Sequence, residues 1–469
     1  MKKWGIMAAL VAVAVGAFFA WKAFKGRGDS MASSLPADIS MVGRVDAKQL
    51  ALDYGLSFSD LKSWLLSGDK EEVGIDLVTP AYVFASEQSL GAIVPLDDAK
   101  QFAQFLRDKG YLTEEQRGLL WTVLDGNILM GIDDDRAMLM GPAVGEAQDF
   151  LRNTIAECLR QDASQSGKQS KIYEQMAQRK EPIALATTMA ALPDGIVPRP
   201  VSKLLRNIDL SELGLSAGLT AHKERISLSL TPQSDNTTVN SFLDKLNEVF
   251  QPIDGSLVQS APARPALHLE IGLDGTKLLT LLRQNQAIRT VMLMLNTLFD
   301  FDMLMNNIAG DVSLTWPSLS GDFVMQASVT DDSFMQNVSS WNDKLTRLAG
   351  LQFQSATANQ ASANYKGKTY YFSTNNNLLR ISRTPSLAYS TGHYDVKHRI
   401  QDEMKGCRLF ASADLAELTQ ALSEGQTERY LKLFQRVDIS LTTTRELRID
   451  LVAREGANLL QELMTQTQD

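Results

Sequence analysis

One series of sequence patterns occurs twice along this chain of 469 residues, in the same order. Residues 41–50 have the pattern of a strand that ends at Asp46, whose carboxylate is suited to cap a following helix. Residues 268–279 repeat that pattern around Asp274. Recurrence at so long a spacing excludes a solenoid or a propeller, whose repeats are only about 20–50 residues long.

Further pairs of segments follow in the two halves of the chain. Residues 121–130 and 371–380 each place Asp, Asn or Gly residues between two β-rich stretches, which is typical of a hairpin. Residues 218–228 and 440–451 are the most similar pair of segments. We therefore predict an internal duplication. The alternative is that the hairpins and helices of any α+β chain can be paired in this way.

The predicted fold class is α+β, with two related halves preceded by one N-terminal transmembrane helix. Hairpins dominate each half, which predicts largely antiparallel sheets with the helices gathered on one face. A doubly wound parallel sheet requires βαβ crossovers throughout, and the sequence does not show them. The predicted parts are the helix and its basic flank at 1–29, a linker at 30–37, the first repeat at 38–259, a proline-containing linker at 260–265 and the second repeat at 266–469.

The N-terminal segment has the composition of a membrane anchor. Lys2 and Lys3 precede an 18-residue run without charge from Trp4 to Trp21, which is about 27 Å long as a helix. This length approaches the hydrocarbon thickness of a bilayer, and Trp side chains favour the membrane interface. We predict an uncleaved signal anchor. A cleaved signal peptide and a buried helix are the alternatives.

Net charge separates this segment from the rest of the chain. Residues 1–29 carry +4 and the whole chain carries −9, so the remaining residues carry −13. An acidic body is repelled by an anionic leaflet and argues against a nucleic-acid partner. We therefore expect a single-pass protein of the bacterial envelope that contacts the membrane through its N-terminal helix, with an extracytoplasmic, periplasmic body. Secretion after signal cleavage is the alternative.

Cysteine and serine patterns give no catalytic site. The two cysteines, Cys158 and Cys407, exclude a multi-cysteine metal site and leave their own pairing open. Ser216 lies in a G-x-S-x-G sequence, the pattern of a nucleophile elbow that joins a strand to a helix. Here the pattern instead begins a strand that continues into a hairpin. We predict no catalytic residue, no cofactor and no enzymatic activity.

Clusters of histidine and aspartate also favour structural roles. His393 and His398 are five residues apart, a spacing that does not place both on one helical face, and we interpret them as part of a surface loop. The run 133–135 lacks the remaining ligands of a calcium loop. The pairs 97–98 and 331–332 each precede a predicted helix, where Asp caps free backbone N–H groups. No metal site is predicted.

Residues 291–305 form the most apolar stretch of the body and hold four of the 17 methionines. We interpret the stretch as core, because residues 56–66 occupy the same place in the first half. Flexible methionine side chains also suit varied hydrophobic ligands. If this protein holds such a ligand, the candidate contacts are Met292, Met294 and Met303, in a groove between the halves.

The sequence around the first strand resembles an uncharacterised bacterial cell-envelope family. Residues 35–50 are similar to that family's opening, in which P-A-D, a strand and D-x-K-x-L follow an export signal, and residues 82–85 and 93–98 are also similar. Members are often lipoproteins, but this chain has no cysteine near its apolar run, which favours attachment through a helix. The resemblance implies no established activity and assigns no functional residue.

These observations predict a membrane-anchored, extracytoplasmic protein of unknown molecular activity. The favoured function is a non-enzymatic binding or scaffolding module of the envelope, with an envelope protein as its partner. A carrier or sensor of a hydrophobic, lipid-like ligand is the first alternative, and a hydrolase is a distant one.

Overall fold

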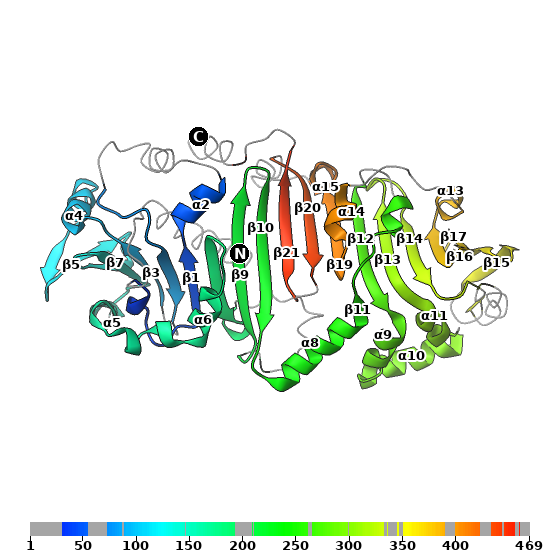
Figure 1. Ribbon diagram of the computed structural model, residues 1–469, viewed down its shortest axis with the longest axis horizontal. Helices are drawn as coiled ribbons and strands as arrows, with labels where there is room; N and C mark the ends of the chain where they lie inside the picture. The colour runs from blue at the N-terminus through cyan, green and yellow to red at the C-terminus, as the bar shows by residue number, and fades with distance from the viewer. Residues whose placement is uncertain are drawn as a thin grey trace. The chain divides into compact units, whose positions relative to one another are not determined.

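The computed structural model describes residues 31–54, 73–86, 89–145, 147–192, 209, 211–260, 265–298, 300–332, 335, 345–346, 350–389, 399–422, 433–442, 445–454 and 459. The chain divides into two compact units, Met1–Val239 and Asn240–Asp469. Strands make up most of the regular structure, and the described residues contain 21 of them (Figure 1).

The first unit is built on ten strands, and each strand pairs antiparallel with its neighbours. Their order across the sheet is β10-β9-β8-β1-β2-β3-β7-β6-β5-β4. The bounds are β1 Met41–Val45, β2 Ala81–Ala85, β3 Leu90–Pro95, β4 Glu114–Gln116, β5 Leu119–Leu124, β6 Ile128–Ile132, β7 Arg136–Gly141, β8 Ile183–Thr188, β9 Gly214–His222 and β10 Arg225–Gln233.

The second unit follows the same strand order, β21-β20-β19-β12-β13-β14-β18-β17-β16-β15, again with antiparallel pairing, and the short strand β11 adds to β12. The bounds are β11 Phe250–Gln251, β12 Leu267–Asp274, β13 Ile308–Trp316, β14 Val324–Val329, β15 Gln352–Thr357, β16 Gln360–Tyr365, β17 Lys368–Asn375, β18 Leu378–Ser382, β19 Leu409–Asp414, β20 Phe434–Leu441 and β21 Leu447–Ala453.

Shared order and register define equivalent positions in the two units. Strand β1 leads to Asp46, which accepts a hydrogen bond from the Gln49 backbone N–H at 2.9 Å. Strand β12 ends at Asp274, which accepts one from Lys277 N–H at 3.0 Å. Both contacts cap the following helix, as the sequence predicted. Position 42 of β1 therefore corresponds to position 270 of β12.

Short helices accompany both sheets. In the first unit they are η1 Met31–Ser34, α2 Ala47–Tyr54, α4 Ala99–Asp108, α5 Ala147–Arg160, η2 Ala163–Gln165, η3 Gly167–Gln169, α6 Lys171–Ala177 and η4 Met189–Ala191, and α8 Thr237–Val249 crosses the division between the units. In the second they are η5 Leu257–Ser260, α9 Gly275–Leu282, α10 Gln286–Leu298, α11 Phe301–Asn307, α13 Pro385–Ala388, α14 Arg399–Met404 and α15 Leu415–Leu422.

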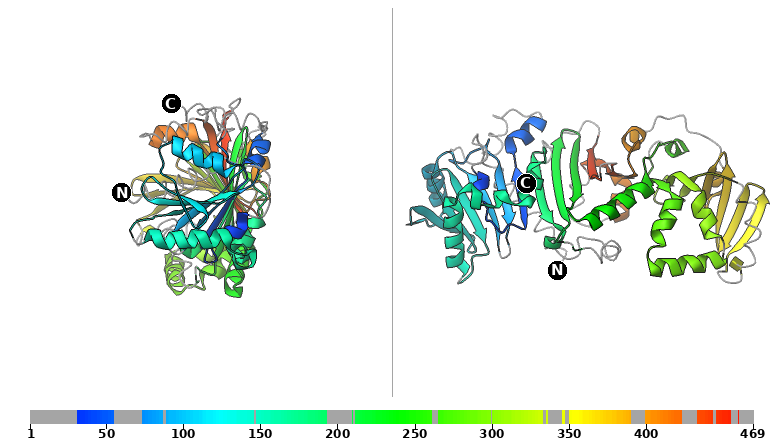
Figure 2. Two further views of the ribbon diagram at one scale, coloured as in Figure 1. Left: turned by 90° about the vertical axis from the view of Figure 1, so that its left-hand side faces the viewer. Right: turned by 60° about the horizontal axis from the view of Figure 1, so that its bottom comes forward.

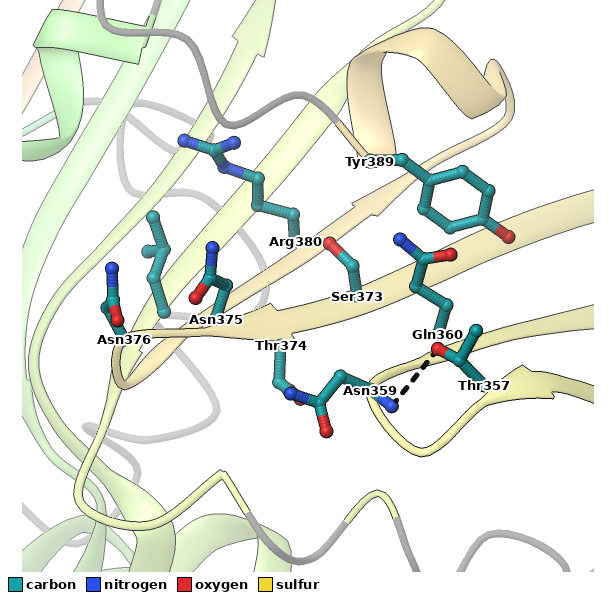
Figure 3. Close-up of a pocket in the computed structure, with 10 residues that line it drawn as sticks. Thr357, Asn359, Gln360, Ser373, Thr374, Asn375, Asn376, Arg380 and Tyr389 are labelled. Carbon is teal, nitrogen blue, oxygen red and sulfur yellow. Dashed lines mark hydrogen bonds between the residues drawn. The ribbon is translucent and has the colours of Figure 1, made fainter.

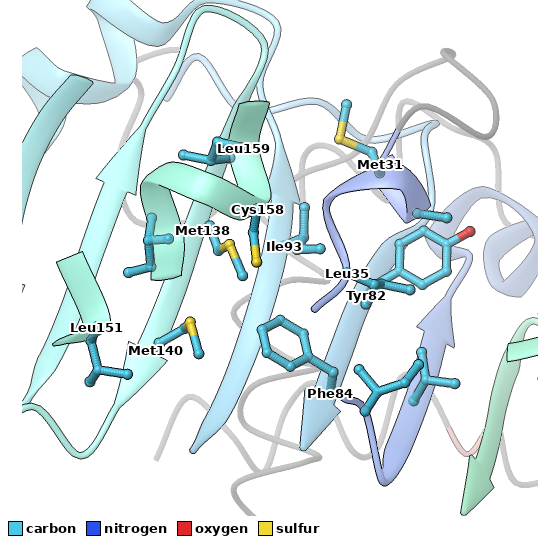
Figure 4. Close-up of a cluster of buried hydrophobic side chains, with 14 of the residues drawn as sticks. Met31, Leu35, Tyr82, Phe84, Ile93, Met138, Met140, Leu151, Cys158 and Leu159 are labelled. Atoms are coloured by element: carbon cyan, nitrogen blue, oxygen red, sulfur yellow. The ribbon is translucent and has the colours of Figure 1, made fainter. Parts of the chain in front are cut away.

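The main core of the first unit lies between one face of its sheet and helix α5. Ile155 of α5 packs with Ile93 of β3 and Met138 of β7, and Phe84 of β2 and Leu35 lie in the same cluster (Figure 4). Burial of such side chains is the main favourable term in folding. This cluster therefore supplies much of the unit's stability.

A second cluster covers the opposite face of the same strands. Val94 and Met130 directly follow Ile93 and Leu129 in sequence, so their side chains point to the other side of the sheet. There they pack against Phe102 of helix α4. The left view of Figure 2 shows α4 and α5 on the two sides of these strands.

These packing contacts correct the predicted fold class. The prediction of an α+β fold with helices on one face of each sheet is wrong. The described residues instead form an extensive antiparallel sheet structure of 21 strands, and in the first unit helices cover both faces. The physical reason is that consecutive side chains of β3, β6 and β7 are apolar, so both faces of these strands must be buried.

No helix in the described part of the chain is both long enough and apolar enough to cross a bilayer. The predicted anchor at 4–21 lies outside the described residues, as do positions 261–264 of the predicted linker and the whole of 56–66.

Helix α4 offers a direct test of the predicted capping. Asp98 accepts hydrogen bonds from Lys100 N–H at 2.9 Å and Gln101 N–H at 3.0 Å, which confirms its role as the cap. We expect Asp98→Ala to lower the free energy of unfolding by about 1 kcal/mol, because two N–H groups lose their acceptor. The matched variant Asp97→Ala is expected to change it by less than about 0.5 kcal/mol. Urea denaturation measures both, and equal losses would contradict the assignment.

Candidate binding site

A polar pocket lies at the tips of two adjacent hairpins in the second unit. Its cavity has a volume of about 500 Å³. The hairpins β15–β16 and β17–β18 supply nine of the ten lining residues, and one residue follows helix α13 (Figure 3). The lining residues are Thr357, Asn359, Gln360, Ser373, Thr374, Asn375, Asn376, Leu378, Arg380 and Tyr389.

A tight turn and two side-chain hydrogen bonds fix the shape of this pocket. Asn376 and Asn377 have φ values of 52° and 59°, the left-handed conformation that a two-residue hairpin turn requires and that Asn tolerates. Ser373 Oγ donates to the Ala388 carbonyl at 2.5 Å, and Tyr389 Oη donates to the Ala361 carbonyl at 3.4 Å. These two bonds hold the end of α13 against strands β16 and β17.

The lining is polar and contains one formal charge. Four amide side chains, three hydroxyl side chains, a tyrosine and a leucine line the pocket together with Arg380, and none of the ten lining residues is acidic. Burial lowers the pKa of Arg380. Thr374 is only 2% exposed, and its Oγ1 has no hydrogen-bond partner among the described residues. Buried hydroxyls nearly always have a partner, so this one is suited to a bound molecule.

The pocket continues into a row of polar side chains across the sheet. Strand register places six residues opposite one another in sequence across β12, β13, β14, β18, β17 and β16, and they share one face. We call them the polar row: Glu270, Ser313, Gln326, Arg380, Ser373 and Gln360. Glu270 Oε1 and Gln326 Nε2 are both buried without a hydrogen-bond partner among the described residues.

The equivalent row of the first unit is apolar. Val42 corresponds to Glu270, and the register continues through Phe84, Gly91, Met140 and Leu129. Val42, Phe84, Met140 and Leu129 belong to the main core of that unit. Equivalent positions of the same strand order thus form a hydrophobic core in the first unit and hold buried polar groups in the second. Polar groups are costly to bury without partners, so the difference indicates a role other than stability.

A buried histidine and carboxyl group lie at the far end of the polar row. His268 Nδ1 is 2.8 Å from Thr315 Oγ1, and its Nε2 is 3.0 Å from Glu270 Oε2. Burial lowers the pKa of His268 to about 4 and raises the pKa of Glu270 to about 8. At neutral pH the histidine is therefore uncharged, and the protonated Glu270 donates its hydrogen to Nε2.

Asp311 on the next strand joins this cluster to the chain that follows β11. Its Oδ2 accepts hydrogen bonds from Asp254 N–H at 3.0 Å and Gly255 N–H at 3.2 Å. Burial, a hydrogen bond with the Asp254 side chain and the nearby Glu270 raise the pKa of Asp311 to about 8. Asp311 thus holds residues 254–255 against the sheet by accepting these two hydrogen bonds.

The methionines predicted as hydrophobic contacts are not brought together at this pocket. Met292 and Met294 lie on α10, and Met303 lies on α11. Met292 is 4% exposed and Met294 is 64% exposed. Met303 packs against the cluster around Met335. None of the three methionines lines the polar pocket. Their role as ligand contacts stays a prediction.

The remaining residues that the sequence singled out take part in the fold and do not form a site. Ser216 is fully buried near the start of β9, where its Oγ donates to the Thr231 carbonyl at 3.5 Å. Residues 133–135 form the turn between β6 and β7, and Asp135 pairs with Arg136 at 2.7 Å. Cys158 and Cys407 are both free thiols, so neither forms a disulfide. His393 and His398 lie outside the described residues. No group of metal-ligating side chains occurs within the part that is described.

Sequence reasoning missed His268, Glu270 and the pocket residues. The segment 267–273 alternates strictly between leucine or isoleucine and other residues, so it predicts a strand with one apolar and one polar face. Such alternation normally indicates that the polar face is solvated. The signal that distinguishes this strand is its His-x-Glu pair. Its partners come together only through the register, which places Thr315 opposite His268 and Asp311 opposite Gly272.

Fold and site together define an antiparallel β-sheet protein with a polar pocket. The family model described as Domain of unknown function (DUF4836) matches residues 50–418. The chain belongs to this family. The resemblance to an uncharacterised family is thereby confirmed, whereas the family's description gives neither a cellular location nor a lipid attachment.

Solved structures give only remote similarity. Two crystal forms of the protein TP0453 align with this chain, form IV at 12% identity and a TM-score of 0.28 and form I at 11% identity and a TM-score of 0.27. Form IV covers 43% of this chain and 80% of that chain, and form I covers 47% and 86%. No curated protein matches this chain.

Proposed function

We propose that this protein is a non-enzymatic binding module that holds a small polar ligand in its second unit. The observation that carries the proposal is the cavity of about 500 Å³ at the hairpin tips, lined by nine polar residues and one leucine. Small-molecule sites commonly have volumes of about 300–1,000 Å³. The buried Thr374 hydroxyl adds a group that a ligand can satisfy.

The burial of the reactive-looking groups in the described part of the chain supports a non-enzymatic role. His268 and Glu270 are both 0% exposed, and a general acid or base must come within hydrogen-bond distance of its substrate. Ser216 is equally buried within β9. The hydrolase alternative therefore has no accessible nucleophile in its proposed motif.

We further propose that the protein acts in the bacterial envelope, with its body on the extracytoplasmic side. The basic and apolar sequence at 2–21 supports export, and the −13 charge of the rest of the chain argues against adsorption to an anionic leaflet. The partners in this proposal are the membrane, through residues 4–21, and an envelope protein, with no nucleic acid. Secretion after cleavage is the alternative.

One observation favours a second candidate, a carrier or sensor of a hydrophobic ligand. Helix α10 exposes the apolar side chains of Val291, Leu293 and Met294. Apolar side chains that cluster on an exposed surface commonly mark a binding surface. The ligand of this candidate is a lipid-like molecule, and Met294 is its most accessible predicted contact.

Thermal unfolding of the full-length chain with defined compounds distinguishes the two candidates. Monosaccharides, amino acids, dipeptides and nucleosides are the polar probes, and palmitate is the hydrophobic probe. We expect at least one polar probe to raise the Tm, because a ligand that binds only the folded state stabilises it. Thr374→Val, which keeps the side-chain shape and removes the hydroxyl, is expected to reduce that rise by more than half.

Thr122→Val is the matched control. Thr122 in β5 is also buried, and its Oγ1 also lacks a hydrogen-bond partner among the described residues, but it does not line the pocket. Its replacement should leave the ligand-dependent rise unchanged. A rise produced by palmitate alone, and lost in Met294→Ser, would replace the first proposal with the second. A panel without any effect would refute both.

A further inference from the structure

The last strand of the second sheet, β15, offers an edge to another polypeptide. We infer that a second copy of this chain pairs antiparallel with β15 through backbone hydrogen bonds, so that the two copies share one continuous sheet. The inference is independent of the proposed pocket. It follows from four properties of β15: its place in the strand order, its exposure, its lack of charge and the aromatic side chain on its apolar face.

Strand β15 ends the strand order of the second unit. It has six residues and pairs antiparallel with β16, and no other strand among the described residues pairs with it. Figure 1 shows it as the outermost strand beside β16. The outer side of such a strand presents backbone N–H and C=O groups that another strand can pair with.

The strand is open to solvent along its length. Gln352, Gln354, Ser355 and Thr357 are all exposed residues. They include both ends and the middle of the strand, so the edge is accessible throughout. A strand of six residues is about 20 Å long, and an identical strand can align with most of it.

No charge opposes the approach of an identical strand. Residues 351–365 contain β15, the turn after it and β16, and they include no Asp, Glu, Lys, Arg or His. The same stretch contains no proline. Proteins commonly protect an edge strand with charged side chains or proline, because both hinder pairing with another chain. The edge at β15 has neither kind of protection.

The apolar layer on one face of this sheet extends to β15. Phe353 packs against the cluster of Val329, Met335 and Ala361, and its ring centroid is 5.9 Å from that of Phe372. Phe353 is only partly buried. A two-fold axis that pairs two β15 strands antiparallel keeps each face of the sheet on the same side in both copies. The two Phe353 rings then lie near each other and lose contact with water, which favours association.

The opposite face carries two glutamines that suit the same arrangement. Gln352 and Gln354 flank Phe353 in sequence, so their side chains point to the other face. The register with β16 shifts only between Ser355 and Thr357, so the first four residues of β15 form a regular ladder. A pair centred on Phe353 or Gln354 places glutamines opposite each other. Each amide has a donor and an acceptor, so the two side chains can form hydrogen bonds with each other.

Sedimentation velocity of the full-length protein, with one neutral detergent in every sample, tests the inference. We expect mainly monomer at about 1 μM and mainly dimer at about 100 μM, because pairing along a short edge is weak. The double variant Gln352→Lys/Gln354→Lys places like charges opposite each other, so it should raise the dimer dissociation constant at least about tenfold. Its urea midpoint should stay unchanged, since both positions are exposed.

A charge swap identifies the partner as a second copy. Gln352→Glu/Gln354→Glu should weaken self-association as the lysine variant does. An equal mixture of the two variants should dimerise again, because opposite charges then face each other. The matched control is Gln116→Lys on β4, an exposed strand of the first unit, and it should leave the dissociation constant unchanged.

Three results would overturn the inference. A protein that stays monomeric at about 100 μM does not pair with itself, and the edge is then left to a different polypeptide. Dimers that persist in the lysine variant, or that Gln116→Lys weakens equally, do not form through β15. A mixture of the lysine and glutamate variants that stays monomeric would show that these positions do not face each other in the dimer.

Discussion

Raising the pH from 6.5 to 8.5 is expected to lower the free energy of unfolding of this protein by about 4 kcal/mol, with about 2 kcal/mol from each of two buried carboxyls. The groups responsible are Glu270 and Asp311, whose pKa values burial raises to about 8 in the folded state. In the unfolded chain both carboxyls have already ionised near pH 4. Their contribution is therefore favourable in acid and is lost as the pH rises through the folded pKa values.

Three other described groups with shifted pKa values contribute little to the change in stability between pH 6.5 and 8.5. His268 has a lowered pKa of about 4, so its contribution is complete above its ordinary value of 6.5 and is lost only as the pH falls. Burial raises the pKa of Asp438 to about 6, below the window. Burial raises the pKa of the Cys158 thiol to about 12, and the unfolded thiol ionises only around pH 9.

Urea denaturation at several pH values measures this dependence. Glu270→Gln is expected to flatten it and to raise stability at pH 8.5, because the amide is neutral and can still donate to His268 Nε2. Glu115→Gln on the exposed strand β4 is the matched control and should keep the full dependence. An unchanged slope in Glu270→Gln would show that this carboxyl is not protonated in the folded protein.

Removal of the Phe84 side chain is expected to destabilise the first unit by about 3–5 kcal/mol. Phe84 is 1% exposed and lies within the main core with Ile93 and Met138 (Figure 4). Its ring fills the space above Gly91, where an added Cβ would lie 2.2 Å from Phe84 Cζ. Because Gly91 has no side chain, it cannot fill the cavity that Phe84→Ala leaves.

Chemical denaturation of the full-length chain tests this value. Phe150→Ala is the matched control, since Phe150 lies on α5 and is 59% exposed. We expect the control to cost less than about 1 kcal/mol. A similar loss in both variants would mean that the Phe84 side chain does not contribute as a core residue.

Local features of the fold were predictable from sequence, because neighbouring residues alone determine them. The caps at Asp98 and Asp274 are confirmed, and residues 121–130 form the predicted hairpin β5–β6. The proposed match of this hairpin to residues 371–380 is displaced, because strand order relates β5–β6 to β16–β17. Turn residues recur in every hairpin, so they do not identify which hairpins correspond.

Features that depend on tertiary packing and on strand pairing were not predictable from the sequence. The apolar face of α4 shows that the helix packs on a sheet, but not on which side, and this is why helices on one face were expected. Alternation in 267–273 likewise predicts two faces without indicating which is buried. The buried Glu270 and the pocket at Thr374 follow from strand register, which pairs residues distant in sequence.

The way in which the first sheet ends affects how copies of this chain behave when crowded. Its final strand in the order, β4, has only three residues, and Glu114 and Glu115 are two of them. An open strand edge is a template for the backbone of another chain, and amyloid-like growth begins at long, uncharged edges. Two copies that approach through β4 bring carboxylates together over a very short ladder. The strand therefore acts as a stop to sheet extension and protects the protein from aggregating through this edge.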